Sequence, residues 1–289
     1  MSLENPEVLV TGANGFIGRA VCAGLENQIV LKLDRHGVGV NSLCVDLSRH
    51  KIDVSLPKSI KTIYHFAGQI WGDVATEKMM CDHVIEMAKT CGAEQIIFAS
   101  TCAVYGQEAM DAPVSETAQN SPLSPYAEGK LAAEYLLAEA AQNYGFDVAA
   151  LRYFNPFGPG QYEKMAVPAM LAKAGLGQDL EIFGDGQQVR DFIYIDDLAE
   201  ATIKVADVVK GFEIYNVGSG FGVSINQLAE KIIDITHSSA KIIYNPVPDE
   251  RKNLEVYYRV ADISKITNAC SWQPETSLSK GLSAMVEGS

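Results

Sequence analysis

The sequence predicts an α/β protein with a doubly wound parallel sheet and a smaller mixed α/β lobe. Two observations lead to this prediction. Short apolar strands alternate with helical segments through the first half of the chain. These strands are apolar on both faces, which is typical of a parallel sheet covered by helices on each side. The chain has 289 residues, of which 47% are hydrophobic, so it has enough length and apolar surface for such a fold.

The expected elements follow in order along the chain. We expect strands at residues 7–11, 28–34, 43–46, 62–66, 94–100 and 146–153. We expect helices at residues 16–25, 76–91 and 121–144, and shorter ones at 167–174, 196–208 and 225–233. Turn clusters interrupt the second half. We therefore predict one domain over residues 1–153 with parts of 184–217, and an interleaved smaller lobe in the remaining parts of 154–289.

Composition narrows the range of partners and compartments. The net charge of −13 opposes long-range attraction to nucleic acid or to an anionic membrane. No apolar run reaches the ~18 residues of a membrane span, and no signal peptide is recognisable at the start. The six cysteines form no C-x-x-C pair, which favours reduced thiols and no metal site. We expect a cytoplasmic protein with no nucleic-acid, membrane or metal partner.

Glycines stand at positions 12, 15 and 18, directly after the first strand and at the start of the first helix. Gly12 permits a tight turn, Gly15 lets a pyrophosphate approach the backbone, and Gly18 lets the helix pack on the strand. The free N–H groups and the positive dipole of the helix N-terminus favour phosphate. The alternative is a turn that matters only for packing. The context favours binding of a dinucleotide.

Asp34 ends the second strand, nineteen positions after Gly15. A carboxylate there accepts hydrogen bonds from the adenosine ribose and repels the additional phosphate of NADP, so NAD is the predicted cofactor. The alternative is a surface aspartate at a strand end. Arg35 is the one neighbouring feature that would tolerate NADP. Asp46 and Leu47 follow the third strand and are expected to bracket the adenine.

Tyr126 and Lys130 are four residues apart in a predicted helix, so their side chains share one face. A tyrosine with a pKa near ~10 is a poor base, but a neighbouring ammonium and the positive nicotinamide ring favour its phenolate. Thr101 ends the predicted central strand, where ligands bind in a doubly wound sheet. Either segment alone is common on protein surfaces. Together with the glycine loop they predict catalysis on a sugar hydroxyl.

Further motifs occur in one order along the chain: Gly-Phe-Ile-Gly at 15–18, His-Phe-Ala-Gly-Gln at 65–69, Ser-Thr-x-x-Val-Tyr-Gly at 100–106, Ser-Pro-Tyr-x-x-x-Lys at 124–130, Arg-Tyr-Phe-Asn-Pro at 152–156, Phe-Gly-Asp-Gly at 183–186, Tyr-Asn-Val-Gly at 215–218 and Ala-Asp-Ile-Ser-Lys at 261–265. This series resembles the NAD-dependent epimerase/dehydratase family, an extended short-chain dehydrogenase/reductase type with a Rossmann-like fold. The resemblance covers nearly the whole chain and is strongest to UDP-glucose 4-epimerases.

The resemblance implies an enzyme that acts on a sugar bound to a nucleoside diphosphate, most often a UDP-sugar. It implies a catalytic role for Thr101, Tyr126 and Lys130. The implied NAD site comprises Gly12, Asn14, Gly15, Phe16, Ile17, Gly18, Asp34, Arg35, Asp46, Leu47, Phe66, Ala67, Gly68, Ser100, Tyr126, Lys130 and Tyr153. The implied substrate site comprises Gln69, Thr101, Asn155, Arg190 and Arg251. From its own chemistry, Arg190 is a fork donor suited to a diphosphate, or else the partner of Asp191 in a surface salt bridge.

Departures from the family pattern bear on the reaction. Dehydratases of the family carry Asp-Glu after the hydroxyl residue, and decarboxylating members keep the Glu, whereas this chain has Cys102 and Ala103. Both reactions are therefore disfavoured. The loop after Gln69 is shorter than usual, and Glu77 stands where the family usually has Asn. The leading hypothesis is 4-epimerisation, with a 4-keto-sugar reductase or a non-catalytic NAD-binding protein as alternatives.

The helices expected at 76–91 and 121–144 indicate a surface through which two copies of the chain could associate. Residues 131–141 of the second helix are richer in alanine and leucine than a fully solvated helix requires. A wide core-facing stripe with no partner is the alternative. Relatives commonly pair through these two helices, so we expect a homodimer joined by them across a twofold axis.

Overall fold

The structure is a computed structural model that describes residues 5–37, 39–49, 55–70, 72–106, 112–249 and 256–288. Its central layer is a seven-stranded sheet in the order β11-β6-β5-β4-β1-β2-β3, with every neighbouring pair parallel. The strands are β1 (Val8–Thr11), β2 (Val30–Asp34), β3 (Ser42–Cys44), β4 (Thr62–His65), β5 (Gln95–Thr101), β6 (Asp147–Tyr153) and β11 (Phe212–Val217). The strand order reverses between β1 and β4, so the sheet is doubly wound, as predicted.

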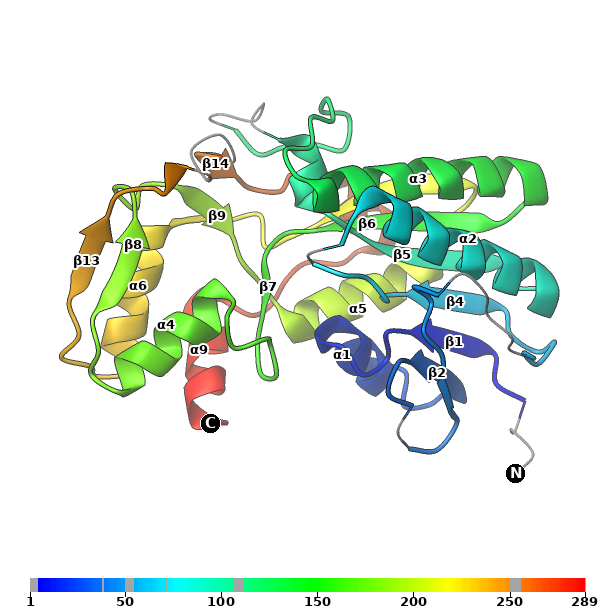
Figure 1. Ribbon diagram of the computed structural model, residues 1–289, viewed down its shortest axis with the longest axis horizontal. Helices are drawn as coiled ribbons and strands as arrows, with labels where there is room; N and C mark the ends of the chain where they lie inside the picture. Colours follow the sequence, from blue (N-terminus) through cyan, green and yellow to red (C-terminus); the bar gives the residue numbers. More distant parts are fainter. Residues whose placement is uncertain are drawn as a thin grey trace.

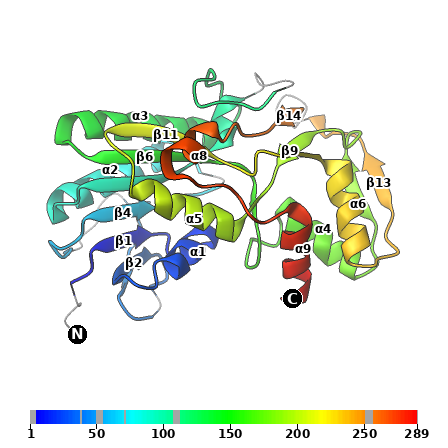
Figure 2. The ribbon, with the colours of Figure 1, turned by 180° about the vertical axis from the view of Figure 1, so that it is seen from behind.

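Helices cover both faces of this sheet, as Figures 1 and 2 show. They are α1 (Phe16–Gly24) and α5 (Ile195–Ala206) on one face and α2 (Val74–Cys91) and α3 (Pro125–Tyr144) on the other. The side chains of β1 alternate between two cores. Val8 and Val10 pack in the core that contains Val21 of α1, and Leu9 packs in the core that contains Leu137 of α3. This alternation explains why the strand is apolar at every position.

The start of α3 at Pro125 corrects the predicted start at Ser121. Ser124 is extended, with φ −144° and ψ 153°, and its side chain accepts a hydrogen bond from the backbone N–H of Ala127. The proline ring disfavours the helical conformation of the residue before it, so the helix begins at the proline itself. The backbone N–H of Ser121 donates instead to the carbonyl of Val104. This turn places Tyr126 in the first turn of α3.

The second half of the chain forms a smaller set of elements beside the sheet (Figure 1). Its helices are α4 (Ala166–Gly175), α6 (Ile225–Ile235) and α9 (Leu278–Glu287), whereas α8 (Ser264–Cys270) packs against β11 and α5. Its strands are β7 (Pro156–Phe157), β8 (Leu180–Phe183), β9 (Val189–Asp191), β10 (Ile193–Tyr194), β12 (Gly222–Ser224), β13 (Ile242–Asn245) and β14 (Tyr258–Arg259). β9 lies between β12 and β14, and β8 pairs with β13. α5 and β11 return to the large sheet, so the chain passes between the two parts more than once.

Within the described ranges, no helix combines the length and apolarity needed to cross a bilayer. All six cysteines are unpaired.

Candidate active site

The predicted glycine loop is pressed against the neighbouring strand end and the start of α1. Gly12 has φ +66°, and a Cβ at this position would lie 2.6 Å from the backbone nitrogen of Ala67. A Cβ on Gly18 would lie 2.1 Å from the carbonyl oxygen of Gly12. No larger residue fits at either position without moving backbone atoms. The loop therefore leaves its backbone open toward the carboxyl end of the sheet, as a pyrophosphate site requires.

Asp34 is the last residue of β2, and its carboxylate reaches this loop. Its carboxylate accepts hydrogen bonds from the backbone N–H of Asn14 at 3.1 Å and of His36 at 3.2 Å. The Asn14 side chain in turn donates to the carbonyl of His36 at 2.6 Å. These contacts join the loops after β1 and β2. The acid therefore lies at the position where an adenosine ribose would meet it.

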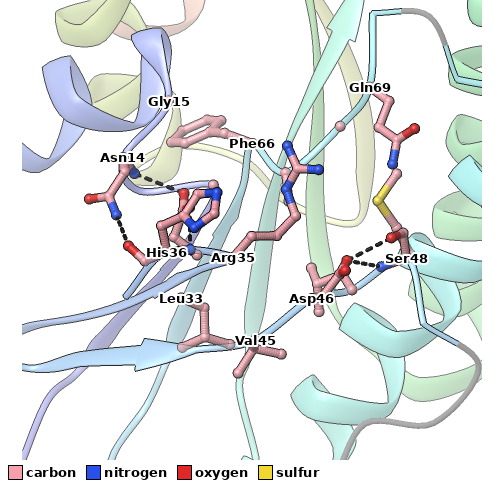
Figure 3. Close-up of a pocket in the computed structure, with 16 residues that line it drawn as sticks. Asn14, Gly15, Leu33, Arg35, His36, Val45, Asp46, Ser48, Phe66 and Gln69 are labelled. Atoms are coloured by element: carbon pink, nitrogen blue, oxygen red, sulfur yellow. Dashed lines mark hydrogen bonds between the residues drawn. The ribbon is translucent and has the colours of Figure 1, made fainter. Parts of the chain in front are cut away.

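A cavity of about 310 Å³ lies beside Asp34 (Figure 3). It is lined by Gly12, Asn14, Gly15, Leu33, Asp34, Arg35, His36, Val45, Asp46, Leu47, Ser48, Phe66, Ala67, Gly68, Gln69 and Met80. The hydrogen bond from the Ser48 hydroxyl, at 2.6 Å, holds the pKa of Asp46 below its usual value, so Asp46 is ionised at neutral pH. Five lining residues belong to no predicted site, because no motif in the sequence marks them: Leu33, His36, Val45, Ser48 and Met80.

A second cavity, of about 540 Å³, adjoins the first and shares Gly12, Gly15, Phe66, Gly68 and Gln69 with it. The predicted residues that line it in addition are Phe16, Ile17, Gly18, Ser100, Thr101, Tyr126, Lys130, Tyr153 and Asn155. Residues outside the prediction complete its wall, among them Ile70, Cys102, Ala103, Gln161, Tyr162, Met165 and Arg259. The two cavities share lining residues and form one cleft at the carboxyl ends of the central strands, where ligands bind in a doubly wound fold.

Thr101, Tyr126 and Lys130 meet in the second cavity, as predicted. The Thr101 hydroxyl oxygen accepts a hydrogen bond from the backbone N–H of Ala103 at 3.2 Å, where β5 passes into a 3₁₀ turn, η1 (Cys102–Tyr105). Its own proton remains available for Tyr126 or a ligand. Burial raises the pKa of Tyr126, and the Lys130 charge and the Thr101 hydroxyl lower it only in part. The phenol is therefore protonated at neutral pH until a further positive charge arrives.

Lys130 is almost fully buried and forms an ion pair with Glu77 of α2, with 2.7 Å between Nζ and Oε1. Burial opposes the ammonium, but the charges of Glu77 and Tyr126 outweigh it and raise the pKa of Lys130. A Cβ on Gly129 would lie 3.1 Å from the Cβ of Glu77, so a glycine at 129 lets α2 approach α3 this closely. Sequence analysis noted Glu77 as a departure from the family pattern and assigned it no partner.

The predicted substrate residues divide into three cases. Asn155 lines the cavity, with φ +31° and its side-chain amide donating to the carbonyl of Asp191 at 2.7 Å. Arg190 lies on β9 and is absent from the described lining. Arg259 lies directly opposite Arg190 in the register of the neighbouring strand β14, and it is Arg259 that lines the cavity. Arg251 lies outside the described residues. Arg259 directly precedes the Val260-Ala261-Asp262 segment, but nothing in the sequence marked it as a cavity residue.

A model of the NAD dependent epimerase/dehydratase family matches residues 8–218. The chain belongs to this family. It is 30% identical to a UDP-glucuronate 4-epimerase from Thermodesulfobacterium geofontis, over 97% of this chain and 95% of that protein. The family resemblance read from the motifs is thereby confirmed.

Solved structures of similar proteins share the fold of this epimerase/dehydratase family member. A UDP-N-acetylglucosamine 4-epimerase from Methanobrevibacter ruminantium, solved with UDP-N-acetylmuramic acid, is 29% identical, with a TM-score of 0.86 and coverage of 98% of this chain and 97% of that chain. A UDP-glucose 4-epimerase from Thermus thermophilus, solved with NAD, is 25% identical, with a TM-score of 0.84 and coverage of 97% of each chain. The predicted Rossmann-like fold and the NAD cofactor are confirmed, and the protein is an enzyme of this NAD-dependent family.

The residues of this epimerase/dehydratase fit NAD. The steric limit at Gly12 keeps the loop open for the pyrophosphate, and Asp34 supplies the acceptor for the ribose. Two further lining hydroxyls are already engaged. Ser100 donates to the buried carboxylate of Glu134, and the Tyr153 hydroxyl shares a 2.9 Å hydrogen bond with Thr202. These two residues therefore shape the wall of the cofactor cleft rather than offer free donors. In the described chain, no group of three or more His, Cys, Asp or Glu side chains is arranged to hold a metal.

Proposed function

We propose that this protein is an NAD-dependent 4-epimerase of nucleoside-diphosphate sugars, with a UDP-sugar as substrate. One observation carries the proposal. Thr101, Tyr126 and Lys130 line one cavity next to the cofactor cleft, whereas the two residues after Thr101, Cys102 and Ala103, carry no carboxyl group. The site thus has a base for a sugar hydroxyl but lacks, at these positions, the acid and base that elimination of water requires.

In the proposed reaction, Tyr126 takes the proton from the C4 hydroxyl of the sugar. Thr101 donates a hydrogen bond to the same oxygen, and Lys130 stabilises the phenolate. NAD, when bound in the cofactor cleft, would supply the acceptor for the hydride from C4 and the donor of that hydride to the 4-keto sugar. The keto sugar must turn over between these two steps, and Tyr126 then returns the proton to the oxygen. The second cavity, of about 540 Å³, is where this turn would take place.

The wider substrate site is part of the proposal. We propose that Gln69 and Asn155 contact the sugar diphosphate and that Arg190 and Arg251 neutralise its charge. The similarity to UDP-sugar 4-epimerases supports uridine as the nucleotide. The predicted cofactor residues are proposed to bind NAD in the roles given above.

The decisive experiment needs no added cofactor. The protein is purified without nicotinamide and incubated with UDP-glucose, UDP-N-acetylglucosamine or UDP-glucuronate, and the C4 epimer is measured by proton NMR. An epimerase regenerates its cofactor in each cycle, so conversion proceeds toward equilibrium without NADH. A reductase converts a 4-keto sugar only while NADH or NADPH is consumed. Absence of both reactions and of C4 hydrogen exchange would leave an NAD-binding protein without catalysis.

We also propose a homodimer joined through α2 and α3. Tyr135 of α3 is 63% exposed, and Leu136 and Ala138 beside it are half-buried, which suits a surface that a second copy covers. Light scattering should give twice the mass of the 31.3 kDa chain. Replacement of Ala138 by Arg should give monomers if this surface forms the interface.

Two further proposals concern organisation and compartment. We propose the domain division at residue 153, with parts of 184–217 returning to the NAD-binding domain, and limited proteolysis near Phe154 tests it. A cytoplasmic location is proposed from the six unpaired cysteines and is tested by cell fractionation.

A further inference from the structure

The second cavity carries an unusual charge for this chain. The described residues that line it include two cations, Lys130 and Arg259, and no Asp or Glu. The whole protein has a net charge of −13, so this wall differs strongly from the average surface. Lys130 is already paired with Glu77. Among the described residues, no carboxylate forms a salt bridge with Arg259, so its charge is available to a ligand.

The Arg259 guanidinium is held in a defined place. Its Nη2 donates a hydrogen bond to the carbonyl of Gly106 at 2.6 Å. Gly106 has φ +65°, and a Cβ there would lie 1.9 Å from the carbonyl oxygen of Ser121, so this acceptor is fixed by close packing. Strand β14 fixes the backbone of Arg259 by pairing with β9. A guanidinium has five N–H donors, and one contact to Gly106 leaves others for the cavity.

Arg259 lines the same cavity as Thr101 and Tyr126. Its guanidinium also interacts with the thiol of Cys102, which directly follows Thr101, and offsets part of the rise that burial causes in the pKa of that thiol. An anionic group bound to Arg259 would therefore lie in the cavity that holds the proposed catalytic residues.

We propose that Arg259 binds a carboxylate on the sugar, so that the substrate class is a nucleoside-diphosphate hexuronate. The inference rests on the proposed function and narrows it. A planar guanidinium matches a carboxylate with two parallel hydrogen bonds, whereas the neutral hydroxymethyl of a hexose matches it poorly. Arg259 is half-buried and has no carboxylate partner among the described residues, so a neutral ligand group beside it would leave its charge without compensation. Binding of a neutral sugar is therefore disfavoured. Arg259 is thus a specificity-determining residue.

The same chemistry would suit a diphosphate, so the test separates the two sources of negative charge. Binding of UDP-glucuronate, UDP-glucose and UDP is measured by calorimetry on NAD-loaded protein carrying Tyr126→Phe to prevent turnover. The protein with native Arg259 should bind UDP-glucuronate at least about tenfold more tightly than UDP-glucose, the gain expected from a charge-assisted pair. If this protein binds UDP-glucuronate no more tightly than UDP-glucose, the proposal is overturned, and no variant of Arg259 is needed to show it.

The variants then assign the effect to the side chain. Arg259→Met should weaken UDP-glucuronate about tenfold to a hundredfold and change UDP-glucose and UDP by less than about twofold. Arg259→Lys keeps the charge but loses the fork, and should give an intermediate loss. Lys231→Met removes an exposed cation from α6 and should leave all three affinities unchanged. Melting temperature and NAD content check that each variant is folded.

Two results contradict the proposal in different ways. An equal loss for all three ligands in Arg259→Met would place the arginine on the diphosphate and overturn the uronate assignment while the proposed epimerase stands. Tighter binding of UDP-glucose than of UDP-glucuronate, together with epimerisation of UDP-glucose by the protein with native Tyr126, would also overturn the uronate assignment while the proposed epimerase stands. Failure of all three ligands to bind would contradict the proposed function itself.

Discussion

Glu77 on α2 and Lys130 on α3 form a buried ion pair with 2.7 Å between the carboxylate and the ammonium. The pair acts on Tyr126 in two opposing ways. Lys130 stabilises the phenolate, while the nearby charge of Glu77 disfavours it and raises the pKa of Tyr126. Glu77 also raises the pKa of Lys130, so the ammonium persists in a buried place. We therefore expect the pH range of activity to depend on Glu77, a residue that is absent from the described lining of both cavities.

Glu77→Gln is expected to shift the pH profile of kcat/KM to lower pH. The rising limb reflects loss of the proton from Tyr126, and its pKa falls when a neighbouring negative charge is removed. The falling limb moves in the same direction, because Glu77 no longer raises the pKa of Lys130. The test is the epimerisation rate at substrate concentrations below KM, measured from pH 5 to pH 11 on protein that is fully loaded with NAD. Glu86→Gln, on the exposed side of the same helix, is the matched control. An unmoved profile in Glu77→Gln would show that the pair is only structural.

Tyr126→Phe should abolish turnover while NAD binding and the melting temperature remain nearly unchanged. The phenol is proposed to act on the substrate proton, and loss of such a general acid–base group costs about a hundredfold to ten-thousandfold in rate. Single-turnover rates, NAD content and thermal unfolding are measured on the same preparation. Retention of more than about a tenth of the activity would assign the proton transfer to another group.

Asp34→Asn should narrow the preference of the protein for NAD over NADP. The carboxylate repels the additional phosphate of NADP, and the amide is uncharged. The substitution keeps the size of the side chain, which joins the loops at Asn14 and His36. Titration of both cofactors by calorimetry gives the ratio of dissociation constants. We expect that ratio to fall by roughly tenfold, a change typical of one charged contact. An unchanged ratio would transfer the discrimination to Arg35 or its neighbours.

Glu134→Ala should destabilise the fold by about 3–5 kcal/mol, because it leaves the buried guanidinium of Arg152 without its partner. The two side chains form a bidentate ion pair, with hydrogen bonds of 2.9 and 2.6 Å, and both are almost fully buried. Urea unfolding followed by circular dichroism gives the free energy of unfolding. Glu139→Ala on the exposed side of α3 should change it by less than about 0.5 kcal/mol. Similar values for the two variants would contradict a stabilising role for the pair.

Sequence reasoning located the glycine loop, Asp34 and the Thr101, Tyr126 and Lys130 group. Each of these signals is local. Glycines at three spacings define a turn, an acid ends a strand, and two residues four apart share a helix face. The parallel sheet then brings these segments to one edge, because the carboxyl ends of its strands lie together. The prediction of a doubly wound parallel sheet was therefore enough to bring the proposed catalytic group and the cofactor loop to one edge of the fold.

Other features depended on packing between segments that are distant in the chain. Glu77 meets Lys130 only because Gly129 lets α2 approach α3, and no spacing in the sequence records that contact. Arg259 lines the cavity and Arg190 does not, although the two are directly opposite each other on the paired strands β14 and β9. The amino-acid sequence by itself determined the fold class and the cofactor through local patterns, and the same patterns supplied the proposed catalytic residues. Only the tertiary structure decided the partners of those residues and the charge of the substrate wall, because these depend on helix approach and strand register.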